Sequence, residues 1–386
     1  MIGGTAVTVA EFAFVLAVII SSKKIFKFFN ENKGFLYIYL IYIIIILASI
    51  IANYDNLSLA RIAIAIVLIV SPLAIGIGTK INQNIFNKII IISLLITGLY
   101  SVLQWTVGIE ATKIPGLNIA YGDTFADKPI GYGFGGREAL KMPSTYQNGN
   151  GVALFFLMAI FFIINLKTQK KFLKLIAIFL GIIGIILSGA RTALIPFILL
   201  IPYAIKKVYD KLHKRNQKIA LIVLLIVGIS IGAFYIMYTN SELIEYMYDR
   251  YIVQTINDPT GSGRVTQIQN VINYIISQDA VGIIRNLIIG SDWSEAFFSE
   301  GIFNIVSYYG VIEAFIFILL LLYPIVKLYK NNKIEVLGLL AVFIAFMIDS
   351  SFNYPPGLMN YFLIAGVLFQ RQKTGLKKND DKELEK

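Results

Sequence analysis

The sequence predicts an all-α integral membrane protein, a polytopic helical bundle of about 11 transmembrane helices. Two observations support this prediction. Of the 386 residues, 57% are hydrophobic, and the mean hydropathy of +0.73 leaves too little polar surface for a soluble domain. Apolar runs of about 20 residues, the length that crosses a bilayer, also recur along the whole chain. We therefore treat residues 1–386 as a single polytopic membrane domain.

Short polar segments separate most of the expected spans. The spans cover residues 2–21, 35–52, 60–78, 88–108, 149–166, 172–188, 192–206, 218–238, 301–323, 334–350 and 356–370. Residues 175–205 allow an alternative, one long kinked helix instead of two spans broken at Ser188-Gly189-Ala190-Arg191. A single crossing would place one of the two flanking lysine clusters outside, so the charge distribution favours two spans. The turn that carries Arg191 is then expected below the outer surface, in a water-filled cavity.

Basic residues set the expected orientation. Alternating crossings place 25 of the 34 lysines and arginines on one side, and the positive-inside rule makes this side cytoplasmic. The N-terminus is then outside and the C-terminus inside, with residues 371–386 as a solvated cytoplasmic tail. Because the net charge of +11 mostly reflects this topology, we do not expect a nucleic-acid partner.

Two long loops are expected on the outer side, at residues 109–148 and 239–300. The second loop is the longest polar interruption of the chain, and its patterning predicts amphipathic helices at 241–251 and 263–277. Since most of the remaining chain is apolar helix, these loops are the expected place for chemistry.

Arginine and lysine separate in this chain. Most arginines lie in outer segments or at outer helix ends, namely Arg61, Arg137, Arg191, Arg250, Arg264 and Arg285. A planar guanidinium suits bidentate binding of phosphate, whereas a lysine acts as a point charge. We therefore expect a phosphorylated ligand, held above all by Arg191 and Arg264. Lys128 and Lys141 look like ordinary loop charges.

Simpler interpretations of these residues stay open. The segment 261–264 (GSGR) can be only a turn and N-cap, and Glu300 only a helix-start charge that favours the dipole. Glu11 and Glu313, which lie inside spans, can mark a proton path or pair with a neighbouring helix. The chain has no cysteine, its single histidine (His213) lies in a cytoplasmic loop, and no Asp-x-Asp occurs outside, so we expect no metal site and no cofactor.

Four segments resemble the O-antigen ligase and repeat-unit polymerase superfamily, specifically its Wzy-type polymerases. They are residues 142–151 (MPSTYQNGNG), 187–194 (LSGARTAL), 261–264 (GSGR) with 288–290, and 299–303 (SEGIF) with 309–311. Their order, spacing and expected side agree over about residues 90–325. The resemblance implies a helical glycosyltransferase of the GT-C type that acts on undecaprenyl-pyrophosphate-linked sugars outside a bacterial cytoplasmic membrane.

The resemblance also implies roles for residues. Arg191 and Arg264 are expected to stabilise the departing pyrophosphate, and Glu300, preferred over Asp292 and Glu295, to accept the proton of the acceptor hydroxyl. Ligases of the family typically carry a histidine near the position of Ser299 and Glu300, and its absence here favours a polymerase. The expected substrate-binding residues are Arg137, Arg250, Arg285, Tyr146, Asn148, Asn150, Asp292, Trp293 and Glu295, with Tyr146 and Trp293 stacking on sugars.

Two other functions remain as alternatives. One is an O-antigen-ligase-like transfer of a finished glycan, and the other is transport of a lipid-linked oligosaccharide by a flippase. A transporter is expected to line several helices with charges at mid-membrane, whereas only Glu11 and Glu313 lie there. The expected partners are the bilayer and the lipid-linked donor and acceptor; a chain-length regulator and a flippase are further candidates.

Overall fold

The computed structural model describes residues 9–112, 141–146, 148–166, 170–210, 248–253, 256–257, 263–293, 296, 299–353 and 355–384. Within these ranges the chain is helical and forms no strand. The α-helices are α1 (Val9–Ile20), α2 (Ser22–Glu31), α3 (Lys33–Ala52), α4 (Leu59–Val70), α5 (Ala74–Gly78), α6 (Gln83–Val107), α7 (Ile109–Thr112), α9 (Gly149–Ile164), α10 (Lys171–Leu187), α11 (Arg191–Asp210), α15 (Arg264–Ser277), α16 (Ala280–Ile288), α17 (Ile302–Tyr309), α18 (Val311–Leu328), α19 (Glu335–Ile348) and α20 (Pro355–Leu384). Shorter helical turns cover Tyr54–Asn56, Ser71–Leu73, Asp249–Val253 and Ser350–Asn353.

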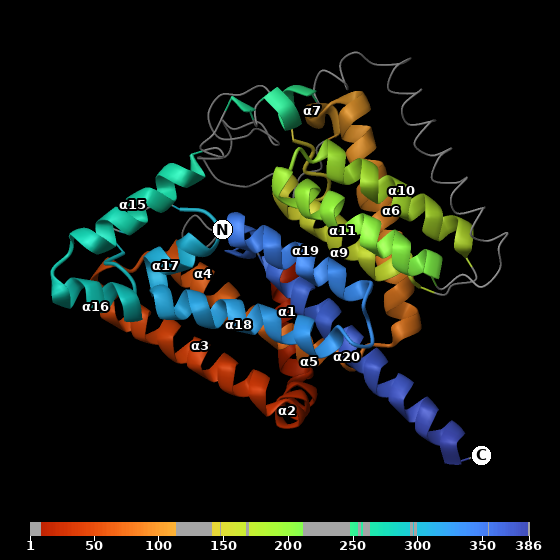
Figure 1. Cartoon of the computed structure of the whole chain (residues 1–386), viewed down its shortest axis with the longest axis horizontal. Coiled ribbons are helices and arrows are strands. Elements are labelled where there is room, and N and C mark those ends of the chain that lie inside the picture. The colour runs from red at the N-terminus through yellow and green to blue at the C-terminus, as the bar shows by residue number, and fades with distance from the viewer. Residues whose placement is uncertain are drawn as a thin grey trace.

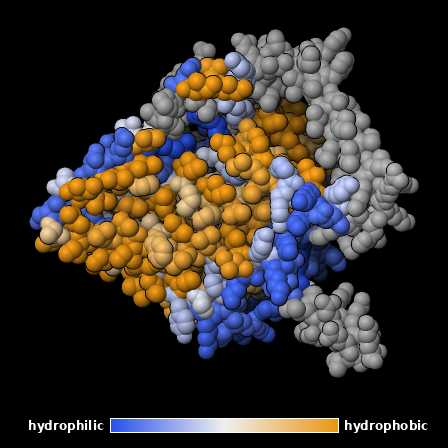
Figure 2. Space-filling model, viewed as in Figure 1, coloured by the Kyte–Doolittle hydropathy of each residue, from blue (hydrophilic) through white to orange (hydrophobic). Residues whose placement is uncertain are grey.

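The protein is a helical membrane protein by the length and composition of its helices. In the described part of the chain, four segments are long and apolar enough to cross a membrane: α3, Arg61–Gly78, α6 and α18. Their outward faces carry exposed apolar side chains, such as Ile44 (64% exposed) and Ile89 (51% exposed). Figure 2 shows the result, a broad hydrophobic face with hydrophilic residues along its edges. Such a surface suits lipid rather than water.

The expected spans coincide with helices wherever the structure describes them, and 218–238 lies outside the described residues. Residues 175–205 form two helices, as expected, because α10 ends at Leu187 and α11 begins at Arg191. That each of them crosses the membrane stays a prediction. Two spans are less regular than expected. The segment 60–78 passes through a 3-10 turn at Ser71–Leu73, and 301–323 is two helices. How many helices cross the membrane stays a prediction.

Gly310 causes the second break. Its φ of +97° ends α17, and a Cβ at this position would lie 2.9 Å from the Leu287 carbonyl oxygen of α16. Only glycine combines this backbone conformation with so close a neighbour. The short helix α17 is thereby turned away from α18 (Figure 1).

The apolar helix α9 lies at the centre of the bundle. Residues 152–163 of α9 are all buried, and α9 packs against α6, α10, α11, α19 and α20. A second close contact joins α5 to α20, where a Cβ on Gly366 would lie 2.1 Å from the Ile75 carbonyl oxygen and one on Gly78 would lie 2.3 Å from that of Leu363. Small residues allow such backbone approach between membrane helices.

The helix ends gather at two opposite ends of the bundle. At one end, Asn165 after α9 donates to Glu335 at the start of α19, and Arg371 of α20 donates to Asn87 of α6 at 2.6 Å. The lysine-rich helix ends, such as those of α2 and α18, lie here, as the charge pattern predicts. At the other end, the start of α9 meets the end of α19 through Asn150 and Asp349.

Two charged residues depart from expectation. Arg371, assigned to a solvated tail, is half-buried and its guanidinium lies 4.2 Å from the Phe162 ring centre, because α20 continues as a helix to Leu384. For Glu313, the sequence left open a partner on a neighbouring helix or a place in a proton path. It is fully buried in α18, and neither carboxyl oxygen has a hydrogen-bond partner among the described residues.

Candidate functional site

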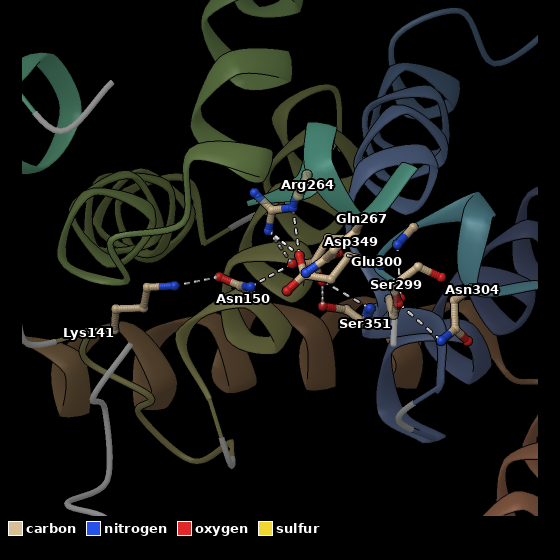
Figure 3. A network of polar contacts seen from close by, with 11 residues as sticks. Lys141, Asn150, Arg264, Gln267, Ser299, Glu300, Asn304, Asp349 and Ser351 are labelled. Atoms are coloured by element: carbon tan, nitrogen blue, oxygen red, sulfur yellow. Dashed lines mark hydrogen bonds and ion pairs between the residues drawn. The ribbon is translucent and has the colours of Figure 1, made fainter. Parts of the chain in front are cut away.

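A polar network lies at the end of the bundle opposite the lysine-rich end, and Arg264 is its centre. Arg264 is the first residue of α15, following Gly263, which has a left-handed conformation. Its Nε donates to Glu300 Oε2 at 2.6 Å, and its Nη2 forms an ion pair with the same carboxylate. Nη2 also lies 3.5 Å from Asp349 Oδ2. Figure 3 shows the guanidinium above both carboxylates.

The backbone of Glu300 is fixed as well as its side chain. Its N–H donates to Gln267 Oε1 at 3.1 Å, and Gln267 lies one turn along α15 from Arg264. The next N–H, that of Gly301, donates to Ser350 Oγ at 2.9 Å. Two residues of α15 and one residue after α19 thus hold the end of the long loop in place.

Asp349 is the most enclosed member of the network, with a side chain only 7% exposed. It follows α19 directly and accepts hydrogen bonds from Asn150 Nδ2 at 2.6 Å and from the N–H of Ser351 at 2.9 Å, besides a bond from the Ser351 hydroxyl. Asn150 Oδ1 in turn accepts from Lys141 Nζ at 3.3 Å. The network therefore joins α9, α15, α19 and the segment before α17.

The arrangement gives the two carboxylates different chemical roles. The formal charges of Arg264 and Lys141 balance those of Glu300 and Asp349. The oxygens of Asp349 are occupied by several donors, so this residue orients its neighbours. Glu300 is 28% exposed, and its Oε1 takes part in no hydrogen bond or ion pair within the described ranges. Glu300 is thus the carboxylate that can accept a proton from a ligand.

Arg191 lies at the same end of the bundle. The turn before it is buried, and a Cβ on Gly149 would lie 2.3 Å from the Ser188 carbonyl oxygen, so the turn touches the start of α9 next to Asn150. The N–H of Met142 also donates to Leu187 O at 3.1 Å. Arg191 itself is half-buried and contributes none of the hydrogen bonds that join Arg264, Glu300 and Asp349.

Arg285, Asp292 and Trp293 form a separate group. Arg285 Nη2 donates to Asn53 Oδ1 at 3.1 Å and lies 3.8 Å from Asp292 Oδ2. Asp292 Oδ1 accepts from Asn56 Nδ2 at 2.7 Å. Trp293 is 6% exposed, and its indole N–H donates to the Tyr308 carbonyl oxygen at 3.0 Å. These contacts attach the loop to the end of α3, and the buried Trp293 is not placed to stack on a sugar.

Tyr146 and Asn148 also have structural roles. Asn148 is the N-cap of α9, because its Oδ1 accepts from the N–H of Gly151 at 2.7 Å. The Tyr146 ring stacks on Phe155, and its hydroxyl accepts from Asn360 Nδ2 at 3.3 Å. Burial raises the pKa of the Tyr146 hydroxyl, so this side chain stays neutral. The ring faces the helix bundle and not Glu300.

Three expected site residues have no described side chain. Arg137 and Glu295 lie outside the described residues, and Arg250 belongs to the turn Asp249–Val253 without a described side chain. Tyr251 in the same turn donates its hydroxyl to Ile186 O at 2.7 Å, which ties the turn to the end of α10.

Sequence reasoning missed five members of the network: Asp349, Gln267, Lys141, Ser350 and Ser351. Asp349 fell inside the expected span 334–350, and Lys141, taken as an ordinary loop charge, contacts Asn150. An acidic residue at the end of an apolar run was the available signal for Asp349. Among the described residues, no group of three or more histidine, cysteine or acidic side chains could hold a metal ion. Neither the family models nor the curated proteins compared with this chain match its sequence.

Proposed function

We propose that the chain is a polysaccharide polymerase that joins undecaprenyl-pyrophosphate-linked oligosaccharide repeat units on the outer face of a bacterial cytoplasmic membrane. The contact between Arg264 and Glu300 carries this proposal. Both residues were selected from the sequence as charge stabiliser and base, from segments 36 positions apart, and they meet at one end of a membrane bundle. Glycosyl transfer from a pyrophosphate donor needs both roles within one site.

The proposed reaction is an inverting displacement. A hydroxyl oxygen of the acceptor unit attacks the anomeric carbon of the donor, and the bond from that carbon to the pyrophosphate oxygen breaks. The hydroxyl proton passes to Oε1 of Glu300, and the lipid pyrophosphate leaves with the bonding electron pair. No redox change and no covalent enzyme intermediate are involved.

The ion pair couples the two events. Before reaction, Glu300 and Asp349 neutralise Arg264. Once Glu300 accepts the proton it becomes neutral and its attraction for the guanidinium weakens, so Arg264 can turn its charge toward the leaving pyrophosphate. The stabilisation thus appears when negative charge develops, which is the condition for lowering the barrier. Arg191, at the same end of the bundle, is the second proposed phosphate ligand.

Gene deletion in the source bacterium tests the proposal against its alternatives. We expect the deletion strain to display single repeat units, with long chains restored by the wild-type gene and not by a Glu300→Gln gene expressed at the same level. Full-length polymer retained on its lipid carrier would instead indicate a ligase. Accumulation of lipid-linked units on the cytoplasmic side would indicate a flippase.

A further inference from the structure

A second polar feature lies at the opposite, lysine-rich end of the bundle. A cavity of about 350 Å³ opens there between α2, the end of the α4–α5 segment and α20. Four lysines line it, Lys24, Lys27, Lys80 and Lys373, together with one carboxylate, Glu31. Phe28 closes its inner side and packs edge-on against Phe369 of α20. The cavity therefore rests on rigid helix packing.

The charges in this cavity do not balance. Glu31 forms an ion pair with Lys373, whose hydrogen bond lowers the pKa of the carboxyl group and keeps it charged. Lys24, Lys27 and Lys80 have no acidic partner within ion-pair distance in the described part of the chain. Lys24 and Lys27 are three residues apart and share one face of α2. Four lysines and one glutamate give the lining of the cavity a formal charge of +3, which favours an anion.

The cavity opens where lipid headgroups are expected. Helix α2 buries Ile25, Phe28 and Phe29 against the bundle, while Phe26 is 69% exposed beside the exposed lysines. An apolar ring among lysines on a short amphipathic helix is typical of a helix at the membrane interface. Basic pockets between membrane helices on the lysine-rich side favour anionic headgroups.

Gln370 adds a second requirement for the ligand of this cavity, namely a hydrogen-bond donor. Its side chain lines the same cavity, and its Oε1 is buried without a hydrogen-bond partner among the described residues. A buried acceptor left unsatisfied is costly, so a ligand that brings a donor gains affinity. The phosphodiester of a phospholipid carries no proton at neutral pH and cannot donate, whereas a headgroup hydroxyl can.

We propose that this cavity binds the phosphate of an anionic phospholipid through Lys24, Lys27 and Lys80, with a headgroup hydroxyl donating to Gln370. Phosphatidylglycerol has this chemistry. The proposal does not depend on the reaction proposed for the other end of the molecule, because no residue is shared between the two sites.

Native mass spectrometry of the full-length protein in detergent tests the proposal by titration with phosphatidylglycerol. A triple variant, Lys24→Gln, Lys27→Gln and Lys80→Gln, is compared with a matched triple, Lys23→Gln, Lys330→Gln and Lys333→Gln. The matched lysines are exposed, lie at the same end and do not line the cavity. Each lysine near a membrane surface contributes roughly fivefold in affinity, so we expect binding to weaken about 100-fold in the first triple and only a few-fold in the second.

Several results would overturn the assignment. Equally weakened phosphatidylglycerol binding in both triple variants would mean that the lipid is held by the general positive charge of this end and not by the cavity. Displacement of the lipid by millimolar inorganic phosphate would mean a soluble phosphate ligand instead. Equal binding of phosphatidylmethanol, a phosphodiester lipid without a headgroup hydroxyl, and phosphatidylglycerol would contradict the proposed hydrogen bond to Gln370. Unchanged binding after Gln370→Leu would contradict it as well. Should the triple variant fold poorly, Lys80→Gln alone is expected to weaken binding about fivefold, and no change in it would also contradict the site.

Discussion

Arg264 shows how a single residue can combine structural and chemical roles. Its guanidinium holds Glu300, which lies before α17, and Asp349, which follows α19. Through them it fixes the end of the long loop against α19. A fork of several N–H groups can contact both carboxylates at once, whereas a lysine ammonium is a single point charge on a flexible stem. The role of the guanidinium can therefore be tested with Arg264→Lys, a substitution that keeps the positive charge.

Arg264→Lys should greatly reduce polymer formation. The loss of about 2.7–4 kcal/mol of transition-state stabilisation corresponds to a rate about 10²–10³ lower. Chain length on gels, at matched membrane levels of protein, measures the effect. Arg61→Lys is the control, because Arg61 lies at the same end but stacks on Tyr308 outside the network. Polymer of normal length from Arg264→Lys would reduce Arg264 to a structural ion pair.

Glu300 and Asp349 should be separable by chemical rescue. Glu300→Ala removes the proposed base and should lower the rate about 10²–10⁴-fold, and added formate should restore part of it, because a small carboxylate can enter the exposed position. Asp349→Ala should also lower the rate, but formate should not restore it, since Asp349 is buried and acts by positioning Asn150 and Arg264. Equal rescue of both variants, or of neither, would contradict these roles.

Glu313 is a residue whose burial has a cost. Both of its oxygens lack partners in the described part of the chain, and an unsatisfied buried polar group costs about 1–3 kcal/mol. Glu313→Met, which has a similar volume, should therefore raise the thermal unfolding temperature in detergent by a few degrees. Glu335→Met is the comparison, and it should lower the temperature because Glu335 accepts from Asn165 and lies near Arg371. A drop in both variants would mean that Glu313 has a stabilising partner.

At the scale of helices, the sequence predicted where the helices lie better than it predicted where they break. The length of the apolar runs was enough to locate α3, α6, α9 and α19, because a long apolar segment is stable only away from water. The break at Gly310 depends on the close approach of α16, a contact between distant segments that no local pattern encodes. The residues of the candidate site were predicted unevenly in the same way. Arg264 and Glu300 stood out as charged residues in a polar loop, whereas Asp349 lies at the end of an apolar run and was included in the predicted span.

The contact between α5 and α20 should tolerate no side chain. A Cβ on Gly366 would lie 2.1 Å from a backbone oxygen, so Gly366→Ala must push the two helices apart. We expect a loss of at least about 1–3 kcal/mol of stability, seen as a lower unfolding temperature in detergent. Gly34→Ala is the matched control, because its Cβ would meet only the Tyr323 ring at 3.3 Å, and a side chain can move. Similar losses in the two variants would argue against the close packing of α5 on α20.

At the scale of the whole molecule, the two ends of the bundle differ in the charged residues that they carry. Lysines gather where α2, α6, α19 and α20 meet, and the arginine-centred network lies where α9, α15 and α19 meet. The positive-inside rule predicts that the lysine-rich end is cytoplasmic, so we expect the candidate site to face outward. This orientation is required by the proposed function, because lipid-linked repeat units would be joined outside.

Cysteine labelling can test this orientation without background, since the chain contains no cysteine. Gln269→Cys on the exposed face of α15 should react with an impermeant thiol reagent in whole cells, and Asn331→Cys between α18 and α19 should react only after the membrane is opened. Both positions are exposed, so access to the reagent decides the result. Labelling of Asn331→Cys in intact cells, with none of Gln269→Cys, would place the network with Arg264 and Glu300 in the cytoplasm. Glycan assembly on the outer face would then be impossible at this site.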